Sequence, residues 1–285
     1  MSGKVMEGAA GQVPAELRLP PLRIAAALLW LRRAAVNMLP LLVMLTVILA
    51  VWQVAADRPS ATLPAPSKIW ADSRELILHP FHDRGGLDKG LGLHLFASLQ
   101  RVALGFVLSA IAGVALGLLV GTSPIAMRGL DPIFQVLRTV PPLAWLPLSL
   151  AAFRDAQPSA IFVIFITAIW PVILNTAAGV QNIPATYRNV GRVLSLNPFE
   201  YFIKIMLPAT VPHMFTGLRI GVGMSWLAIV AAEMVQGGTG IGFFIWDSYN
   251  SSMLSETIVA LIWIGMVGFA LDRIVGGIGK LIARA

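Results

Sequence analysis

The residues of this 285-residue chain that could do chemistry do not form a recognisable catalytic set. There is no cysteine, which excludes disulfides, thiol chemistry and cysteine-based metal sites. There is no serine–histidine–aspartate set, zinc-protease motif or carboxylate pair either. The nearest match to a nucleotide-binding loop, at 276–281, lacks a glycine five residues before Gly279 and a serine or threonine after Lys280. We therefore expect that the chain is not an enzyme and binds no cofactor.

Two further ligand classes are disfavoured. His79 and His82 could suggest a metal site, but Pro80 breaks the helical spacing that would aim both imidazoles at one ion, so we expect no metal. The net charge of +7 would suggest nucleic acid in a soluble protein. Here 57% of the residues are hydrophobic, 12% are charged and the mean hydropathy is +0.78. Soluble domains carry about a quarter charged residues, so the natural solvent is lipid and the basic residues indicate topology and headgroup contacts.

Six apolar segments are each long enough, as helices, to cross a hydrocarbon core of about 30 Å. They predict an all-α integral membrane protein with six transmembrane helices at 36–56, 95–121, 130–153, 159–180, 212–235 and 256–282. Pro141-Pro142 and Pro147 interrupt the third, and such breaks are tolerated only against protein or a water-filled cavity. A short turn is expected at 122–129.

Glycines recur every four residues in the second predicted span, at Gly113, Gly117 and Gly121. In lipid no hydrophobic force drives helices together, and small residues let their backbones approach closely. This stripe therefore predicts a tight contact with another helix.

The distribution of charge predicts the orientation. In the segment 1–35 the basic residues, among them Arg18, Arg23, Arg32 and Arg33, outnumber the acidic ones, so we expect it to be cytoplasmic, part of it (22–33) as a helix on the membrane surface. The stretch 179–219 is also basic, with Glu200 as its one acid, whereas 236–255 has no lysine or arginine. We expect a periplasmic loop at 57–93, a cytoplasmic loop at 180–211, both termini in the cytoplasm, and a transmembrane domain at 36–283.

The polar loop at 180–211 predicts two short helices. Pro184 can open the first, because an early helical position needs no backbone N–H. Asn197 before Pro198 ends it, since the residue before a proline is pushed out of the α region. The second is expected to end at Leu207-Pro208.

Within this loop, residues 189–208 resemble the EAA…G…I-LP loop of ATP-binding-cassette (ABC) importer permeases. Ile205, Leu207 and Pro208 match outright. The departures are Asn189 for the glutamate, Val190 and Gly191 for the two alanines, and Ser195 for the glycine. Other motifs resemble the nitrate/sulfonate/taurine branch: Leu63-Pro64-Ala65-Pro66-Ser67, Arg138-Thr139-Val140-Pro141-Pro142, Ala209-Thr210-Val211-Pro212-His213, Thr216-Gly217-Leu218-Arg219, and Trp226 followed by Ala231-Ala232-Glu233. The stretches 96–102 and 240–250 look most like nitrate permease subunits.

The resemblance covers about residues 36–283 and implies a type I ABC importer permease fold in a bacterial inner membrane. It implies a second permease copy, two ATPase subunits that bind ATP and Mg, and an extracytoplasmic solute-binding protein as partners. The implied activity is ATP-driven import of a small inorganic anion, nitrate above all, by alternating access. Bicarbonate, cyanate and alkanesulfonates remain alternatives, and a stand-alone anion channel or secondary carrier is the alternative of a different class.

The resemblance also makes the loop the coupling helix that enters a groove on each ATPase. Arg188 and Arg192, four residues apart, share one helix face, and Val190, Val193 and Leu194 form another. An amphipathic linker resting on lipid headgroups is the alternative. The implied coupling residues are Tyr187, Arg188, Asn189, Gly191, Arg192, Val193, Leu194, Ser195 and Leu196.

Charged residues inside the predicted spans suggest a translocation path, because intramembrane charges are costly and are usually functional or paired. Arg138 and Arg219 could draw an anion inward, or could simply extend to inner-leaflet phosphates. Glu233 would repel an anion unless a base such as Arg101 neutralises it, so we interpret it as structural or gating. Polar or amphipathic side chains that complete the candidate path are Thr139, Asn175, Ser225 and Trp226.

Overall fold

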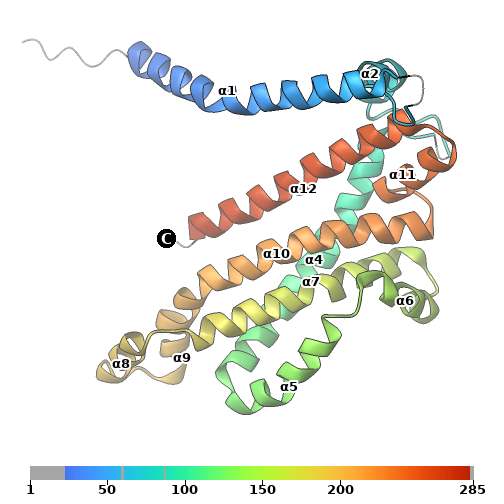
Figure 1. Ribbon diagram of the computed structural model, residues 1–285. Coiled ribbons are helices and arrows are strands. Elements are labelled where there is room, and N and C mark those ends of the chain that lie inside the picture. The colour runs from blue at the N-terminus through green and yellow to red at the C-terminus, as the bar shows by residue number, and fades with distance from the viewer. Residues whose placement is uncertain (1–22, 59–60, 87, 283–285) are drawn as a thin grey trace, which may run out of the picture. The chain divides into compact units, whose positions relative to one another are not determined.

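The computed structural model describes residues 23–58, 61–86 and 88–282 (Figure 1). Within these ranges the regular structure is helical, apart from one isolated bridge between Asp83 and Lys89. The chain divides into two units, Met1–Pro66 and Ser67–Ala285, which are described separately below. Of the predicted cytoplasmic segment 1–35, residues 1–22 lie outside the described residues, as does residue 283 at the end of the predicted transmembrane domain.

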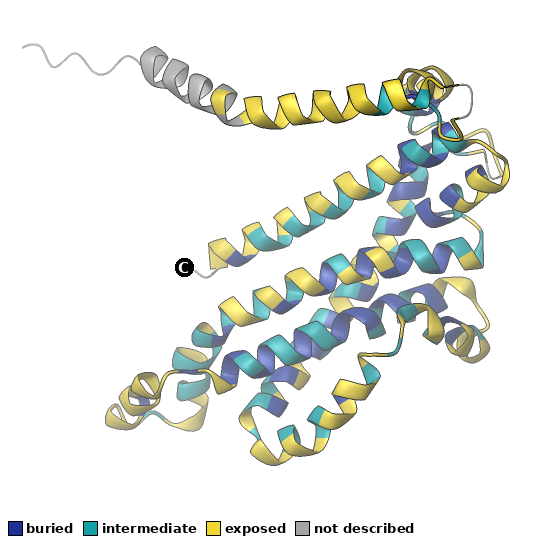
Figure 2. Ribbon diagram, in the orientation of Figure 1, coloured by how far each residue is buried: buried dark blue, intermediate teal, exposed yellow. Residues whose placement is uncertain are grey.

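The first unit contains one long helix, α1 (Arg23–Ala56). Its stretch Met38–Ala56 is apolar enough to cross a membrane, and its large apolar side chains are exposed (Figure 2). The separate surface helix and span that the sequence predicted are therefore one helix. No glycine or proline separates residue 33 from residue 38 to break it, and Pro40 lies inside it, as prolines in membrane helices do.

The second unit holds the remaining helices. They are α2 (Pro66–Asp72, whose first residue belongs to the first unit), α3 (Arg74–Leu78), α4 (Leu91–Thr122), α5 (Pro124–Leu137), a 3₁₀ turn (Pro142–Ala144), α6 (Trp145–Phe153), α7 (Ala156–Gln181), α8 (Ala185–Val193), α9 (Pro198–Tyr201), a π segment (Phe202–Met206), α10 (Leu207–Gln236), α11 (Ile241–Asn250) and α12 (Leu254–Ile282). Helix α7 is the most buried of the long apolar helices, and both α4 and α10 pack along it (Figures 1 and 2).

The predicted glycine stripe of α4 makes the close contact with α7. Gly113 faces Val172, Gly117 faces Thr176 and Gly121 faces Val180, so both helices advance four residues per contact. A Cβ atom on Gly117 would lie 2.6 Å from Thr176 Cβ, which is too close for any side chain. The prediction of a tight helix contact is confirmed, because only glycine allows the two backbones to approach this closely here.

The third predicted span is broken, as its prolines indicated. Helices α5 and α6 meet at an angle of 88° across the break that contains Pro141. The turn expected at 122–129 is wrong, because α5 begins at Pro124, directly after Ser123. Proline is favoured at the first helical position, and the Ser123 hydroxyl caps the helix by accepting the N–H of Ala126 at 3.2 Å. The described residues thus contain five helices able to span a membrane, or six if the bent pair is one span.

Candidate functional site

The predicted coupling helix is α8, which starts after Pro184 and presents an apolar surface. Val193 is 83% exposed and Leu194 is 63% exposed, and Val190 and Tyr187 are exposed beside them. Arg188 and Arg192 line one groove of about 530 Å³, together with Tyr201 of α9. The arginines and the exposed apolar residues therefore occupy the two faces that their spacing predicts. Asn189, at the position of the family's glutamate, is also exposed.

The backbone at the end of α8 favours a glycine at residue 195, where the EAA…G…I-LP loop has one and this chain has Ser195. The Leu196 N–H donates to the Gly191 carbonyl and the Ser195 N–H donates to the Arg192 carbonyl, each at 3.0 Å. This pair of bonds is a Schellman motif, and it places Ser195 in the left-handed region with φ of 50°. Glycine occupies that region without a penalty, whereas a residue with a Cβ pays about 1–2 kcal/mol.

Gly191 fixes α8 against the next helix. It is buried, and a Cβ atom there would lie 2.8 Å from Cδ2 of the Tyr201 ring. The predicted break at Asn197-Pro198 is present and forms a capping box. The Glu200 N–H donates to Asn197 Oδ1 at 2.8 Å, and the Asn197 N–H donates to Glu200 Oε2 at 3.1 Å. Helices α8 and α9 are therefore packed against each other and joined by a hydrogen-bonded turn.

The predicted helix end at Leu207-Pro208 is wrong, and so is a fifth span that starts at residue 212. From Pro198 to Gln236 the chain stays helical, through α9, the π segment and α10. In a regular α-helix the ring of Pro208 would clash with the carbonyl four residues earlier. The π segment, in which the Leu207 N–H donates to Phe202 O, widens the helix at this point. The predicted coupling loop is thus directly continuous with α10.

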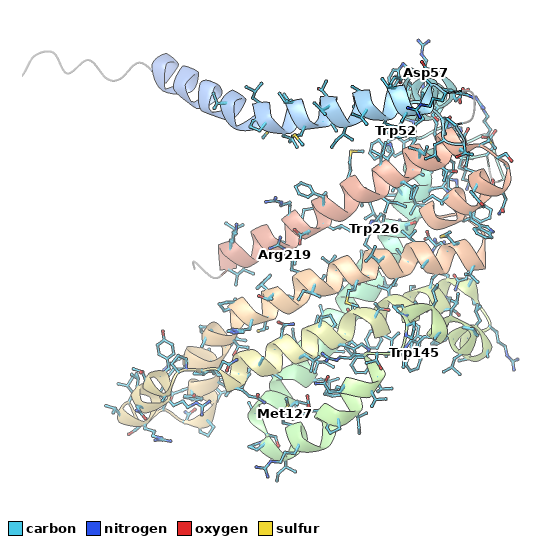
Figure 3. All side chains as sticks on the ribbon, in the orientation of Figure 1. Trp52, Asp57, Met127, Trp145, Arg219 and Trp226 are labelled. Atoms are coloured by element: carbon cyan, nitrogen blue, oxygen red, sulfur yellow. The ribbon has the colours of Figure 1, made fainter. Side chains whose placement is uncertain are left out.

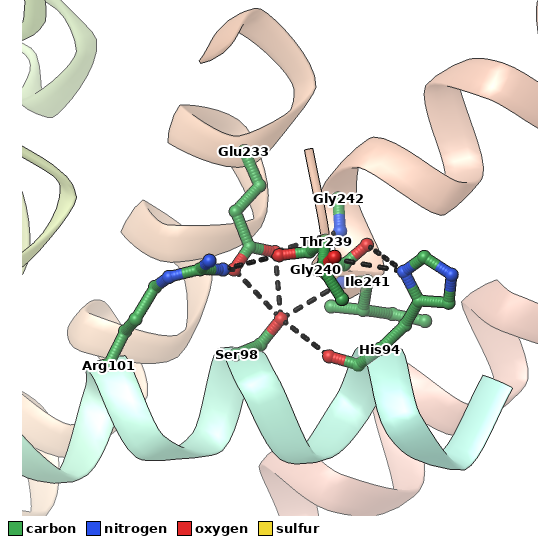
Figure 4. A network of polar contacts seen from close by, with 8 residues as sticks. All are labelled: His94, Ser98, Arg101, Glu233, Thr239, Gly240, Ile241 and Gly242. Carbon is green, nitrogen blue, oxygen red and sulfur yellow. Dashed lines mark hydrogen bonds and ion pairs between the residues drawn. The ribbon is translucent and has the colours of Figure 1, made fainter. Parts of the chain in front are cut away.

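At the other end of α10, Glu233 is the centre of a buried polar network (Figure 4). Its carboxylate accepts bonds from Arg101 Nη1 at 2.7 Å, from Ser98 Oγ at 2.8 and 2.9 Å, and from the Gly242 N–H at 3.0 Å. Arg101 is the basic residue that the sequence suggested as a partner for Glu233, and the two form an ion pair.

The same network holds the turn between α10 and α11 against α4. Arg101 Nη1 donates to the Thr239 carbonyl at 2.6 Å, and the Ile241 N–H donates to Ser98 Oγ at 2.9 Å. His94 Nδ1 lies 3.0 Å from the Gly240 carbonyl oxygen. Neither Gly240 nor Gly242 has room for a Cβ beside Glu233. We call the set His94, Ser98, Arg101, Glu233 and residues 239–242 the α10 clamp.

The remaining predicted path residues are spread over three helices. Arg138 caps the end of α5 and is exposed, as is Thr139, whose hydroxyl donates to Val136 O. On α7, the Asn175 side chain donates to Pro171 O of its own helix at 2.8 Å. Among the described residues, none of the seven predicted path residues hydrogen-bonds to another. Ser225 is buried in α10.

Two path residues on α10 contact α12 (Figure 3). Buried Trp226 donates its indole N–H to Ile264 O at 3.0 Å, and Arg219 forms a two-point ion pair with Asp272, with Arg219 Nη2 to Oδ2 at 2.6 Å. Three residues of these contacts were not predicted from the sequence: Asp272, Ser98 and His94. Asp272 could have been found by the same reasoning as Arg219, since it is a charge within an apolar segment. Ser98 and His94 carry no comparable signal.

Comparison with known proteins places this architecture in a family. The family model described as "Binding-protein-dependent transport system inner membrane component" matches residues 109–285. The nitrate import permease protein NrtB of Synechocystis sp. is 58% identical over 243 residues, which covers 85% of this chain and 88% of the relative. The bicarbonate transport system permease protein CmpB of Synechocystis sp. is 52% identical over 238 residues, or 82% of this chain and 85% of the relative.

A solved structure of the MetNI methionine ABC transporter, described as inward facing, superposes with a TM-score of 0.61 at 14% identity. It covers 67% of this chain and 95% of that chain, and at this identity the likeness concerns the fold alone. The helices of this chain therefore have the fold of an ABC importer permease of type I, and the chain belongs to the family of binding-protein-dependent transport system inner membrane components.

Proposed function

We propose that the chain is the permease of an ATP-driven nitrate importer in a bacterial inner membrane. The observation that carries the proposal is the 58% identity to a nitrate import permease along 85% of this chain. As a transport subunit it leaves ATP hydrolysis, with its Mg, to separate ATPase subunits. The proposed assembly has two permease copies, two ATPases and one extracytoplasmic binding protein. Its termini and α8 lie in the cytoplasm, and residues 57–93 lie outside.

In this assembly α8 is the part that an ATPase grips. Its exposed Val193 and Leu194 can fill an apolar groove, and Arg192 can pair with acids at the groove's edge. The contact of Gly191 with Tyr201 makes α8 move with α9, and the unbroken helix from Pro198 to Gln236 carries the movement into the membrane. Closure of the ATPase dimer would therefore tilt α10 as a rigid body, the step that alternating access requires.

The α10 clamp is proposed to fix the outer end of the same helix. Because Glu233 and Arg101 neutralise each other, the clamp presents no free negative charge to an arriving anion. Helix α10 is thus pushed at its inner end and held at its outer end against α4 and α11. Glu233 then serves to hold the outer end of α10 while the inner end moves, and it does not bind the anion.

Of Arg138 and Arg219, Arg138 is the better candidate for attracting the anion. Asp272 offsets the charge of Arg219, whereas Arg138 makes no ion pair within the described part of the chain. Nitrate is weakly hydrated and needs little more than a wettable, weakly positive path. Tight binding there would slow release, so the selectivity is expected to reside mainly in the binding protein.

Bicarbonate is the second candidate substrate, because a bicarbonate permease is 52% identical over a similar length. The test is reconstitution of the permease with its cognate ATPases and binding protein in proteoliposomes. Uptake of labelled nitrate is measured with and without an excess of bicarbonate, and the reverse. Nitrate uptake that tenfold bicarbonate leaves unchanged supports the proposal. Bicarbonate uptake without nitrate uptake contradicts it.

A further inference from the structure

A second basic pocket lies where the membrane-spanning helices α4 and α7 end and the coupling loop begins. Its volume is about 460 Å³. Thr122 closes α4, Arg128 lies on α5, Val180 is at the end of α7, and Arg188 and Tyr201 come from α8 and α9. It therefore brings together residues of five helices.

The lining of this pocket is positive. Arg128 and Arg188 both contribute to it, and no aspartate or glutamate does. Arg188 Nη2 donates to the Gln181 carbonyl at 3.2 Å, which holds the guanidinium at the pocket while leaving its other N–H groups available. Arg128 forms no ion pair within the described ranges, whereas Arg101 and Arg219 are each paired with an acid. Two guanidinium groups that line one pocket and lack an acidic partner among the residues that the structure describes favour a phosphate, which each can bind through two N–H groups.

The pocket also has an apolar part, which is lined by Met127, Val180, Ile183 and Met206. The apolar helices α4 and α7 end at Thr122 and Gln181, so the pocket lies at the edge of the hydrocarbon region, where headgroups are found. A small soluble anion would leave the apolar part of the wall without a partner. An amphiphile with a phosphate headgroup matches both parts.

We propose that this pocket binds the phosphate of an anionic phospholipid, with Arg128 and Arg188 as its ligands. Under the orientation in the proposed function, on which this assignment of leaflet rests, the lipid belongs to the cytoplasmic leaflet. Such a lipid ties α5 to the coupling helix α8, because one arginine comes from each. Basic pockets between helices on the cytoplasmic side are known to bind anionic headgroups. The bound lipid would make coupling sensitive to the anionic lipid content of the membrane.

The test is a titration of the purified full chain, delipidated in a neutral detergent, followed by native mass spectrometry. The ligands are phosphatidylglycerol, phosphatidylcholine and inorganic phosphate. Arg128→Gln should weaken phosphatidylglycerol binding about tenfold, as loss of one charge-assisted contact does. Arg128→Lys should retain most of it. The matched control is Lys280→Gln, which removes one exposed positive charge from the end of α12, outside the pocket lining, and should bind like the native chain.

Three outcomes would contradict the inference. If the native chain and Arg128→Gln bind phosphatidylglycerol equally, this pocket is not the lipid site. If Lys280→Gln weakens binding as much as Arg128→Gln, the lipid is attracted by positive charge alone. Inorganic phosphate that competes as well as phosphatidylglycerol assigns the pocket to a soluble anion. The assay contains neither ATPase nor nitrate, so its failure leaves the proposed function intact. A failure of nitrate import likewise leaves this binding result standing.

Discussion

Arg101 of α4 and Glu233 of α10 form an ion pair at 2.7 Å with both side chains mostly buried, 17% and 3% exposed. Buried pairs are not strongly stabilising relative to an apolar pair, but removal of one partner leaves an uncompensated buried charge. In this chain the pair also holds the α10–α11 turn in place, because Arg101 donates to the Thr239 carbonyl and Glu233 accepts the Gly242 N–H. Its importance is therefore positional: it fixes where the C-terminal end of α10 lies.

The first prediction concerns this pair. Glu233→Ala should destabilise the protein by about 3–5 kcal/mol, because Arg101 and the Gly242 N–H lose a buried partner. Thermal unfolding of the purified chain in detergent measures the change. Glu75→Gln, which removes the acid of an exposed ion pair with Arg84, is the control and should change stability by less than about 1 kcal/mol. A melting temperature for Glu233→Ala equal to that of the native chain would contradict the clamp.

The second prediction concerns the left-handed residue that ends α8. Ser195→Gly should stabilise the α8 terminus by about 1 kcal/mol, because glycine adopts φ of 50° without a Cβ clash. Hydrogen exchange of the α8 amides should slow correspondingly. Ser195→Ala keeps the Cβ and should exchange at the native rate, and Ser195→Val should exchange faster. Slower exchange in Ser195→Ala as well as Ser195→Gly would refute the conformational explanation.

The third prediction concerns ATPase coupling. Arg192→Glu combined with Leu194→Asp reverses a charge and makes an exposed apolar anchor polar, so it should abolish co-purification of the ATPase and ATP-driven uptake. Neither side chain is buried, so the variant should fold and insert normally. Lys68→Glu on α2, an exposed charge reversal in the predicted outer loop, should leave ATPase association unchanged. If the double variant still binds the ATPase and imports its anion, α8 is not the coupling helix.

The fourth prediction separates the two roles that remain open for Arg138. If it attracts the anion, Arg138→Gln should lower the rate of nitrate uptake several-fold without altering ATPase association, and Arg138→Lys should restore most of the rate. Uptake by the assembled transporter in proteoliposomes at low ionic strength measures both, because salt screens such an attraction. Unchanged uptake by Arg138→Gln would leave this arginine only a contact with lipid phosphates.

Local patterns predicted much of this fold, because the length of an apolar segment and the spacing of its small residues can be seen directly in the sequence. The glycines Gly113, Gly117 and Gly121 predicted the contact of α4 with α7. The prolines at 141 and 142 predicted a break in the third span, but not its 88° bend, which depends on packing. Pro208 was interpreted as a helix end, because a π segment that accommodates a proline has no simple sequence signal.

Contacts between distant segments were beyond such patterns. The sequence suggested Arg101 as a partner for Glu233 from charge alone, and the ion pair is present. It could not predict that Ser98, His94 and the backbone of residues 240–242 complete the network, because their meeting requires the placement of α4 beside α10. Asp272 is 53 residues from Arg219, and only the packing of α12 on α10 makes them partners. The roles of the predicted coupling and path residues remain predictions.

We propose that this permease moves its anion inward only when separate ATPases drive it. The direct measurement is uptake of labelled nitrate into proteoliposomes that contain the permease alone, or the permease with its ATPases and binding protein. We expect uptake that requires all the components and hydrolysable ATP, and that stops when a non-hydrolysable ATP analogue is used instead. Nitrate uptake down its gradient through the permease alone, at a rate matching the full assembly, would contradict it.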